Sequence, residues 1–165
     1  MAKITLKVSN LGAFGFPQKK LQQVLSEFNK RDLKAVGNDV IKEMKDLISK
    51  GVSPIRQVGR FEAYKNPEKY PKKVIGRFPS KKQKPVNLSL SGNFLKSLNV
   101  LSSNNGKLTI GFNSKLSEEK EQGHRDGANG QRKRPIIPKS GEEFAVSIQK
   151  IIIDEMVKRL NALFK

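Results

Sequence analysis

A stretch without any hydrophobic period, residues 51–85, divides this chain and limits what it can fold into. It holds five of the eight prolines, and ten Lys or Arg side chains are interleaved with four aromatic ones. A segment this long without regular structure inside a compact domain is typically functional or disordered. We therefore interpret residues 51–85 as a basic, Pro/Gly-rich arm or long loop that becomes ordered on a partner.

With 165 residues the chain is long enough for one domain, and we expect residues 1–165 to form a single one. Before the arm, apolar residues alternate over positions 4–8, which predicts a strand with one buried face. Apolar residues then recur every three or four positions over 21–48, which indicates a helix. Gly37 weakens this pattern and predicts a soft point or a break into two helices, and Gly51 is placed to end the helix.

The pattern after the arm predicts a small β unit over residues 86–112. In chain order it comprises alternating apolar residues at 86–90, a helical turn at 92–97, strands at 98–102 and 108–112, and an Asn-Asn-Gly hairpin turn at 104–106. The hairpin prediction rests on the Asn-Gly pair, because these residues readily adopt the positive φ that tight turns need.

The last part of the chain predicts a polar helix or loop at 114–122, a Gly/Arg-rich loop at 123–138 and a closing helix. Ser140 is placed as the N-cap of that helix, with Glu143 at the capping-box position. One apolar stripe at helical spacing runs along it, formed by Phe144, Ile148, Ile151, Ile152, Met156, Leu160 and Leu163. We interpret this stripe as core, with a subunit interface as the alternative.

The formal net charge is +18, and +12 of it lies in residues 51–85 and 124–140. Such an excess repels itself, so the native setting is expected to supply anions from nucleic acid, an acidic protein or a membrane surface. The chain has no cysteine and one histidine, which excludes disulfides, zinc fingers and sites that need two histidines. Neither a membrane-length apolar run nor a secretion signal is present.

Two interpretations of the arm stay open. In the first, the arm binds nucleic acid, with its cations on phosphates and its aromatic rings stacked on bases. In the second, the arm docks on a neighbouring protein that has acidic patches. We favour docking, because no known nucleic-acid motif organises these residues. The candidate contact residues in the arm are Arg56, Arg60, Phe61, Tyr64, Tyr70, Lys72, Lys73, Arg77, Phe78, Lys81 and Lys82.

The second loop adds Arg125, Arg132, Lys133 and Arg134 to these candidate contacts. His124 and Asp126 have the residue types of a general base and the group that orients it. No nucleophile motif accompanies them, and no acids are paired at metal-ligand spacing. We therefore interpret this loop as structural or interfacial, and expect no catalytic activity, metal or cofactor.

The order of these features resembles the minor tail, neck and tail-completion proteins of tailed bacteriophages, including the tail-terminator group. The resemblance rests on four segments, which are Pro85 to Leu98, Leu108 to Phe112, Glu121 to Gly127 and the turn Arg134-Pro135-Ile136-Ile137-Pro138 before the last helix. It covers residues 15–165 and is strongest over 85–160. The chain departs from the family in its longer, more basic 51–85 segment and in Ile where the family often has Phe.

The resemblance implies an α+β fold, with an antiparallel sheet and a long hairpin or arm packed against an N-terminal and a C-terminal helix. It also implies a structural virion protein that assembles in the host cytoplasm into a homo-oligomeric ring, often a hexamer. That ring would complete or terminate the tail and join its tube to the head connector or adaptor proteins, with DNA passing through it. The alternative function is a basic DNA- or RNA-packaging protein that uses the 51–85 arm.

Overall fold

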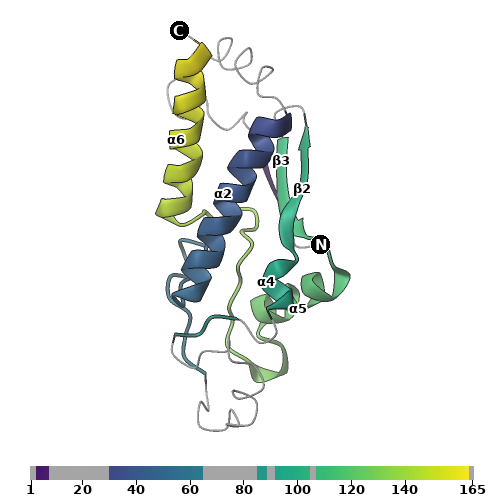
Figure 1. Cartoon of the computed structure of the whole chain (residues 1–165). Helices are drawn as coiled ribbons and strands as arrows, with labels where there is room; N and C mark the ends of the chain where they lie inside the picture. The colour runs from purple at the N-terminus through teal and green to yellow at the C-terminus, as the bar shows by residue number, and fades with distance from the viewer. Residues whose placement is uncertain (1–2, 8–29, 65–84, 89–91, 105–106, 164–165) are drawn as a thin grey trace.

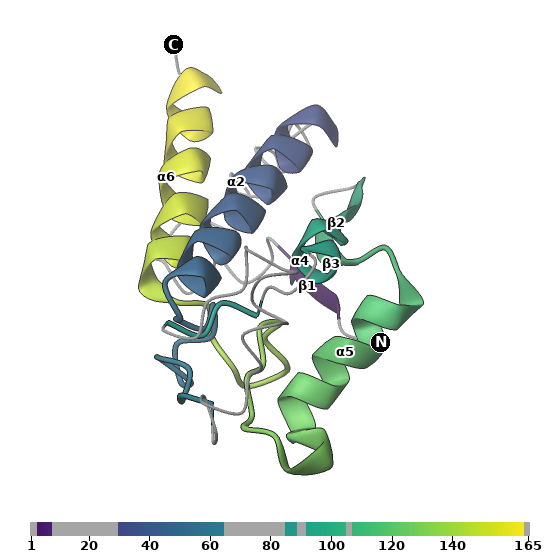
Figure 2. The same cartoon turned by 60° about the horizontal axis from the view of Figure 1, so that its bottom comes forward.

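A computed structural model describes residues 3–7, 30–64, 85–88, 92–104 and 107–163. Its elements in chain order are β1 (Lys3–Lys7), α2 (Lys30–Ser49), α4 (Asn93–Lys96), β2 (Leu98–Asn104), β3 (Lys107–Phe112), α5 (Lys115–Asp126), the 3₁₀ turn η3 (Ala128–Gly130) and α6 (Val146–Leu163). Figure 1 shows α2 lying between α6 and the strands β2 and β3, and Figure 2 shows the same order of layers. The predicted α+β architecture is confirmed.

The strands form one antiparallel sheet in the order β1-β3-β2. The N-terminal strand predicted from alternating residues is confirmed over β1, which pairs with β3 from Lys3↔Gly111 to Lys7↔Lys107. The predicted hairpin is also confirmed, because β2 and β3 pair antiparallel and Asn104 faces Lys107. Only two residues lie between them, the loop length that an Asn-Gly pair favours.

Strand β2 departs from the predicted alternation in its middle. Val100 faces Ile110 and Ser102 faces Thr109, so Leu101 is left as an extra residue in a bulge. Beyond the bulge the alternation shifts by one position, and Ser103 rather than Ser102 is buried. Leu101, next to the inward-facing Val100, is an exposed apolar residue in this strand.

Helix α2 confirms the later half of the helical pattern, and the earlier part, Leu21 to Phe28, lies outside the described residues. Of the two alternatives at Gly37, the break into two helices is wrong, because α2 continues through this residue. A Cβ atom at Gly37 would lie 2.5 Å from Val100 Cγ2 and 2.8 Å from Leu108 Cδ1. This glycine therefore allows the helix to approach the sheet closely.

The core lies between α2, the hairpin and the segments that precede α6. Its fully buried apolar side chains come from distant parts of the chain and include Val40, Met44, Ile48, Ile55, Ile110, Ile136 and Ile148. The predicted inward stripe of β3 is confirmed, since Leu108, Ile110 and Phe112 are all buried.

Residues 51–64 belong to the folded body, which corrects the predicted start of the arm. Gly51 ends α2 with φ +76°, and the N–H groups of Gly51 and Val52 donate to the carbonyls of Ile48 and Leu47. This pattern is a Schellman motif, in which glycine tolerates the left-handed conformation. The chain then turns back, and the N–H of Phe61 donates to the Gly51 carbonyl at 2.8 Å.

The predicted strand at 86–90 is not formed by its described residues. Residues 85–88 are irregular, although Val86 and Leu88 are both buried. Pro85 lies against Gly51, because a Cβ at Gly51 would be 2.6 Å from the Pro85 Cβ. The described residues on either side of segment 65–84 therefore both lie near the C-terminal end of α2.

Two helix boundaries also differ from prediction. Helix α5 extends to Asp126, so Gly123, His124 and Arg125 are helical and the second loop begins at Gly127. Helix α6 begins at Val146, not after Ser140, because residues 143–145 pair with residues 54–57. Among these contacts Phe144 forms a β-bridge with Ile55, so long-range pairing prevails over the local capping signal.

Candidate functional site

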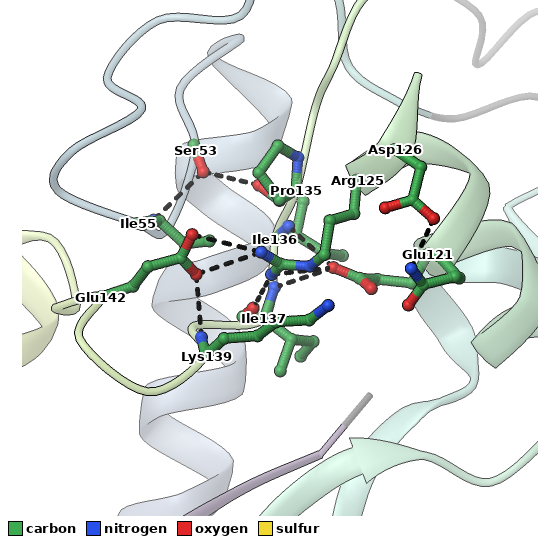
Figure 3. Close-up of polar contacts among 11 residues, drawn as sticks. Ser53, Ile55, Glu121, Arg125, Asp126, Pro135, Ile136, Ile137, Lys139 and Glu142 are labelled. Carbon is green, nitrogen blue, oxygen red and sulfur yellow. Dashed lines mark hydrogen bonds and ion pairs between the residues drawn. The ribbon is translucent and has the colours of Figure 1, made fainter. Parts of the chain in front are cut away.

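A cluster of buried charges fastens the segment after α5 to the body of the protein (Figure 3). Glu121 is fully buried, and one helical turn later the guanidinium of Arg125 lies 3.4 Å from its Oε1 atom. The same guanidinium lies 3.1 Å from Glu142 Oε2 and donates to the Ile137 carbonyl. We call Glu121, Arg125 and Glu142 the Glu121 cluster.

Backbone groups of the following segment complete this cluster. Glu121 Oε1 accepts the N–H groups of Ile136 at 3.3 Å and Ile137 at 3.4 Å, and Glu142 Oε2 accepts the Lys139 N–H at 2.8 Å. These bonds compensate Glu121 Oε1 for its loss of water, while Oε2 of the same carboxylate is buried without a hydrogen-bond partner among the described residues. Residues 136–142 are therefore held to α5 by charge-assisted hydrogen bonds.

Two further buried polar residues tie this segment to residues 53–64. The Ser53 hydroxyl donates to the Pro135 carbonyl at 2.7 Å and accepts the Ile55 N–H at 3.1 Å. Arg134 is 3% exposed, and its guanidinium donates to the Glu62 and Ala63 carbonyls and lies 4.8 Å from the centre of the Tyr64 ring. Tyr64 is the last described residue before segment 65–84, so Arg134 fixes the point from which that segment leaves.

Three of the predicted contact residues are corrected by this arrangement. Phe61 is part of the core, while Arg125 and Arg134 have their guanidinium groups engaged inside the protein. Such side chains act by holding the surrounding loops and do not reach a partner from this conformation. Sequence reasoning missed Glu121 and Ser53 as buried polar residues. The sequence shows only that they lie within otherwise polar or irregular segments.

Four other predicted contact residues are exposed. Arg56 pairs with Glu143 at 3.0 Å and Arg132 pairs with Glu62, while Arg60 and Lys133 are exposed cations. Tyr64 is half-buried, packs against the core and has the Arg134 guanidinium over its ring, so it also belongs to the folded body. The other seven predicted contacts lie outside the described residues, and they are Tyr70, Lys72, Lys73, Arg77, Phe78, Lys81 and Lys82.

Helix α5 does not bring His124 and Asp126 together as a general base and the group that orients it. Residues two positions apart on a helix do not face each other. The Asp126 carboxylate accepts the Gln122 amide N–H, while the His124 ring lies 5.5 Å from the ring of Phe94. Across the described ranges, no group of three acidic, His or Cys residues could hold a metal ion, and no helix is long and apolar enough to cross a membrane.

Exposed apolar residues form a second kind of candidate surface. Among the described residues the large exposed ones are Leu101, Leu116, Val146, Ile153 and Val157. The last three are spaced by seven and four positions along α6, which places them on one helical face within an arc of about 40°. Ile148, on the opposite side, is fully buried, so α6 carries apolar residues on both sides. Only the inward stripe was recognised from sequence.

The two groups of exposed apolar residues lie on opposite flanks of the molecule. Val146, Ile153 and Val157 belong to α6, while Leu101 and Leu116 belong to β2 and α5. Helix α2 separates these flanks in both views (Figures 1 and 2). Comparison with protein-family models, characterised proteins and solved structures finds no match.

Proposed function

We propose that this chain is a structural subunit of a homo-oligomeric ring at the head–tail junction of a tailed bacteriophage. In this role the ring completes or terminates the tail and joins the tail tube to the head connector or adaptor. The resemblance described above supplies the virion context. The observation that carries the proposal is the exposure of apolar residues on two opposite flanks.

The distribution of these residues favours a ring over a two-fold dimer. A two-fold dimer uses the same patch on both copies, whereas head-to-tail assembly joins two different patches and closes into a ring when the rotation permits. Helix α6 supports this view, because it carries apolar residues on two sides, and an apolar helix face is typically covered. Among the described residues of one copy, the side with Ile148 is buried while Val146, Ile153 and Val157 are exposed.

The Glu121 cluster supports assembly from subunits whose structure is already ordered before they bind one another. It fixes residues 136–142 without help from another molecule. A surface that is already ordered loses less conformational entropy when it binds. The ring would therefore form from subunits whose loops already have their final shape.

Segment 65–84 supports a contact with anions beyond the ring. It contains eight Lys or Arg residues and one Glu in its sequence, and the described residues on both sides of it lie at one end of α2. Its partner in this proposal is the tail tube, the connector or the DNA that passes through the ring. The chemistry shared by these partners is a negatively charged surface.

The first experiment is a native mass measurement at low and high salt, followed by mixing with tail tubes and electron microscopy. We expect a discrete ring mass that persists in high salt, or rings that appear on the tube ends. A protein that remains monomeric in solution and does not bind tube ends would overturn the proposal.

A matched pair of variants tests the role of segment 65–84. Replacing its eight Lys and Arg residues by Gln should leave the melting temperature unchanged and abolish docking on tubes. The control replaces its seven Lys by Arg, which keeps the charge and should keep docking. Equal docking by both variants would exclude an electrostatic role for this segment.

The same charge favours a second candidate, a nucleic-acid-packaging protein. If about six cations neutralise phosphates, the logarithm of the binding constant should fall with the logarithm of salt at a slope near −5. A species loaded with nucleic acid that becomes a bare monomer at high salt would favour this function over the ring.

A further inference from the structure

Resting on the proposed ring, we propose which two surfaces join its subunits. The outer face of α6 in one copy, formed by Val146, Ile153 and Val157, packs against the β2–α5 flank of the next copy, where β2 exposes Leu101 and α5 exposes Leu116. The occupant of each surface is thus a second copy of this chain, in a head-to-tail contact.

The distribution of charge points to these surfaces. Two copies with a net charge of +18 repel each other, so they associate most easily where the local charge is balanced. Residues 141–165 carry four cations and four acids, and residues 86–123 carry four cations and three acids. All five large apolar residues exposed in the described structure lie in these two nearly neutral ranges.

The charged residues beside the two surfaces are also compatible with a mutual contact. On α6, exposed Lys150 and Asp154 lie next to the apolar face, one of each sign. On α5, exposed Lys115 and Glu119 lie next to Leu116, again one of each sign. Opposite charges can therefore be paired across the contact, which fixes the orientation of the two copies.

Pairing α6 with α6 of another copy fits the structure less well. Such a two-fold contact would cover Val146, Ile153 and Val157 but leave Leu101 and Leu116 exposed. Leu101 lies in β2, which is paired with β3, and its side chain is exposed there. The head-to-tail contact covers both groups at once.

The chain has no cysteine, so cysteine pairs can report on the contact directly. The first double variant combines Ile153→Cys with Leu116→Cys, and the second combines Ile153→Cys with Leu101→Cys. Each is treated with a short bismaleimide linker, alone and with tail tubes, and then separated on a denaturing gel. The control double variant combines Ile153→Cys with Lys42→Cys, because Lys42 is exposed on α2, a helix that contributes to neither surface.

We expect at least one of the first two variants to give a ladder of dimers, trimers and larger species up to the closed ring. The single variants and the control should not give a ladder, because a head-to-tail link needs both reactive positions. Thermal unfolding of each variant should match the parent, since all the substituted residues are exposed.

Two results would overturn the proposal. Efficient dimers from Ile153→Cys alone, without a ladder from the doubles, would show an α6–α6 contact. The absence of a ladder from both doubles, with and without tubes, would show that the ring uses other surfaces or that another protein covers these faces. A ring mass without a ladder refutes only this inference, whereas the absence of any ring refutes the proposed function as well.

Discussion

The substitution Gly37→Ala tests how closely α2 approaches the sheet. Alanine in a helix interior is more favourable than glycine by about 1 kcal/mol, so an unobstructed site gains stability. At Gly37 the new methyl group would lie 2.5 Å from Val100 Cγ2 and 2.8 Å from Leu108 Cδ1. Distances below 3.0 Å require atoms to move.

Neither neighbour can move easily. Val100 is branched at Cβ and has few alternative rotamers, while Leu108 is buried in a closely packed core. Overpacking of this kind costs about 1–3 kcal/mol, and we take the upper part of that range. After subtraction of the helical gain, Gly37→Ala should lower the free energy of unfolding by about 1–2 kcal/mol.

Gly123 provides a matched control in another helix. It lies inside α5, and a Cβ there would have only the Ala128 Cβ within 4 Å, at 3.8 Å. Gly123→Ala should therefore raise the free energy of unfolding by about 1 kcal/mol. The same chemical change is expected to have opposite signs at two helical sites.

Urea unfolding followed by circular dichroism measures both effects, and thermal unfolding gives a second readout. For a chain of this size, Gly37→Ala should lower the melting temperature by about 2–8 °C. Stabilisation by Gly37→Ala equal to that by Gly123→Ala would refute the close approach between α2 and the sheet. A destabilising Gly123→Ala would refute the open position assigned to that residue.

Three further predictions concern the buried charges and the apolar face of α6. Glu121→Ala should cost about 3 kcal/mol in urea unfolding, because it leaves two buried N–H groups without their acceptor and removes one partner of Arg125. Arg134→Lys should lower the free energy of unfolding by about 1–2 kcal/mol, because one ammonium group cannot replace a planar guanidinium that binds two carbonyls and stacks on Tyr64. The control Arg132→Lys, at an exposed ion pair, should change the free energy of unfolding by less than about 0.5 kcal/mol. Ile153→Glu should leave the melting temperature unchanged but shift the native mass from ring to monomer, and a persistent ring would exclude the outer face of α6 from the contact.

Predictions made from periodicity succeeded where local pattern and final structure coincide. The alternation in β3, the Asn-Gly hairpin, the helical repeat of α2 and the glycine at its end all depend on neighbouring residues. Such features follow from the geometry of one strand or helix, so a single sequence is enough to find them.

The errors have a different origin. The capping signal at Ser140 and Glu143 was overridden because Phe144 pairs with Ile55, a residue far away in the sequence. The bulge at Leu101 depends on the register between two strands, which the alternation of one strand does not contain. A break of the helix at Gly37 was one alternative because the close neighbours of this glycine, Val100 and Leu108, were not known from sequence.

The candidate site shows the same difference between features set by neighbouring residues and features set by distant segments. Sequence alone identified the basic segments, and it assigned Arg125 and Arg134 to a partner surface. The structure directs their guanidinium groups inward, to Glu121, Glu142 and backbone carbonyls. Composition reports how many charges a chain has, whereas burial of a charge depends on acceptors supplied by other segments.

Local sequence by itself thus determined β1, the β2–β3 hairpin and the described helix α2, together with the net charge of +18 and its concentration in two stretches. Tertiary structure decided which glycine permits close packing, which arginines are buried and which apolar residues remain exposed on α6 and the β2–α5 flank. The physical reason is that hydrogen-bond periodicity acts over a few residues, while burial is set by contacts between segments distant in the chain.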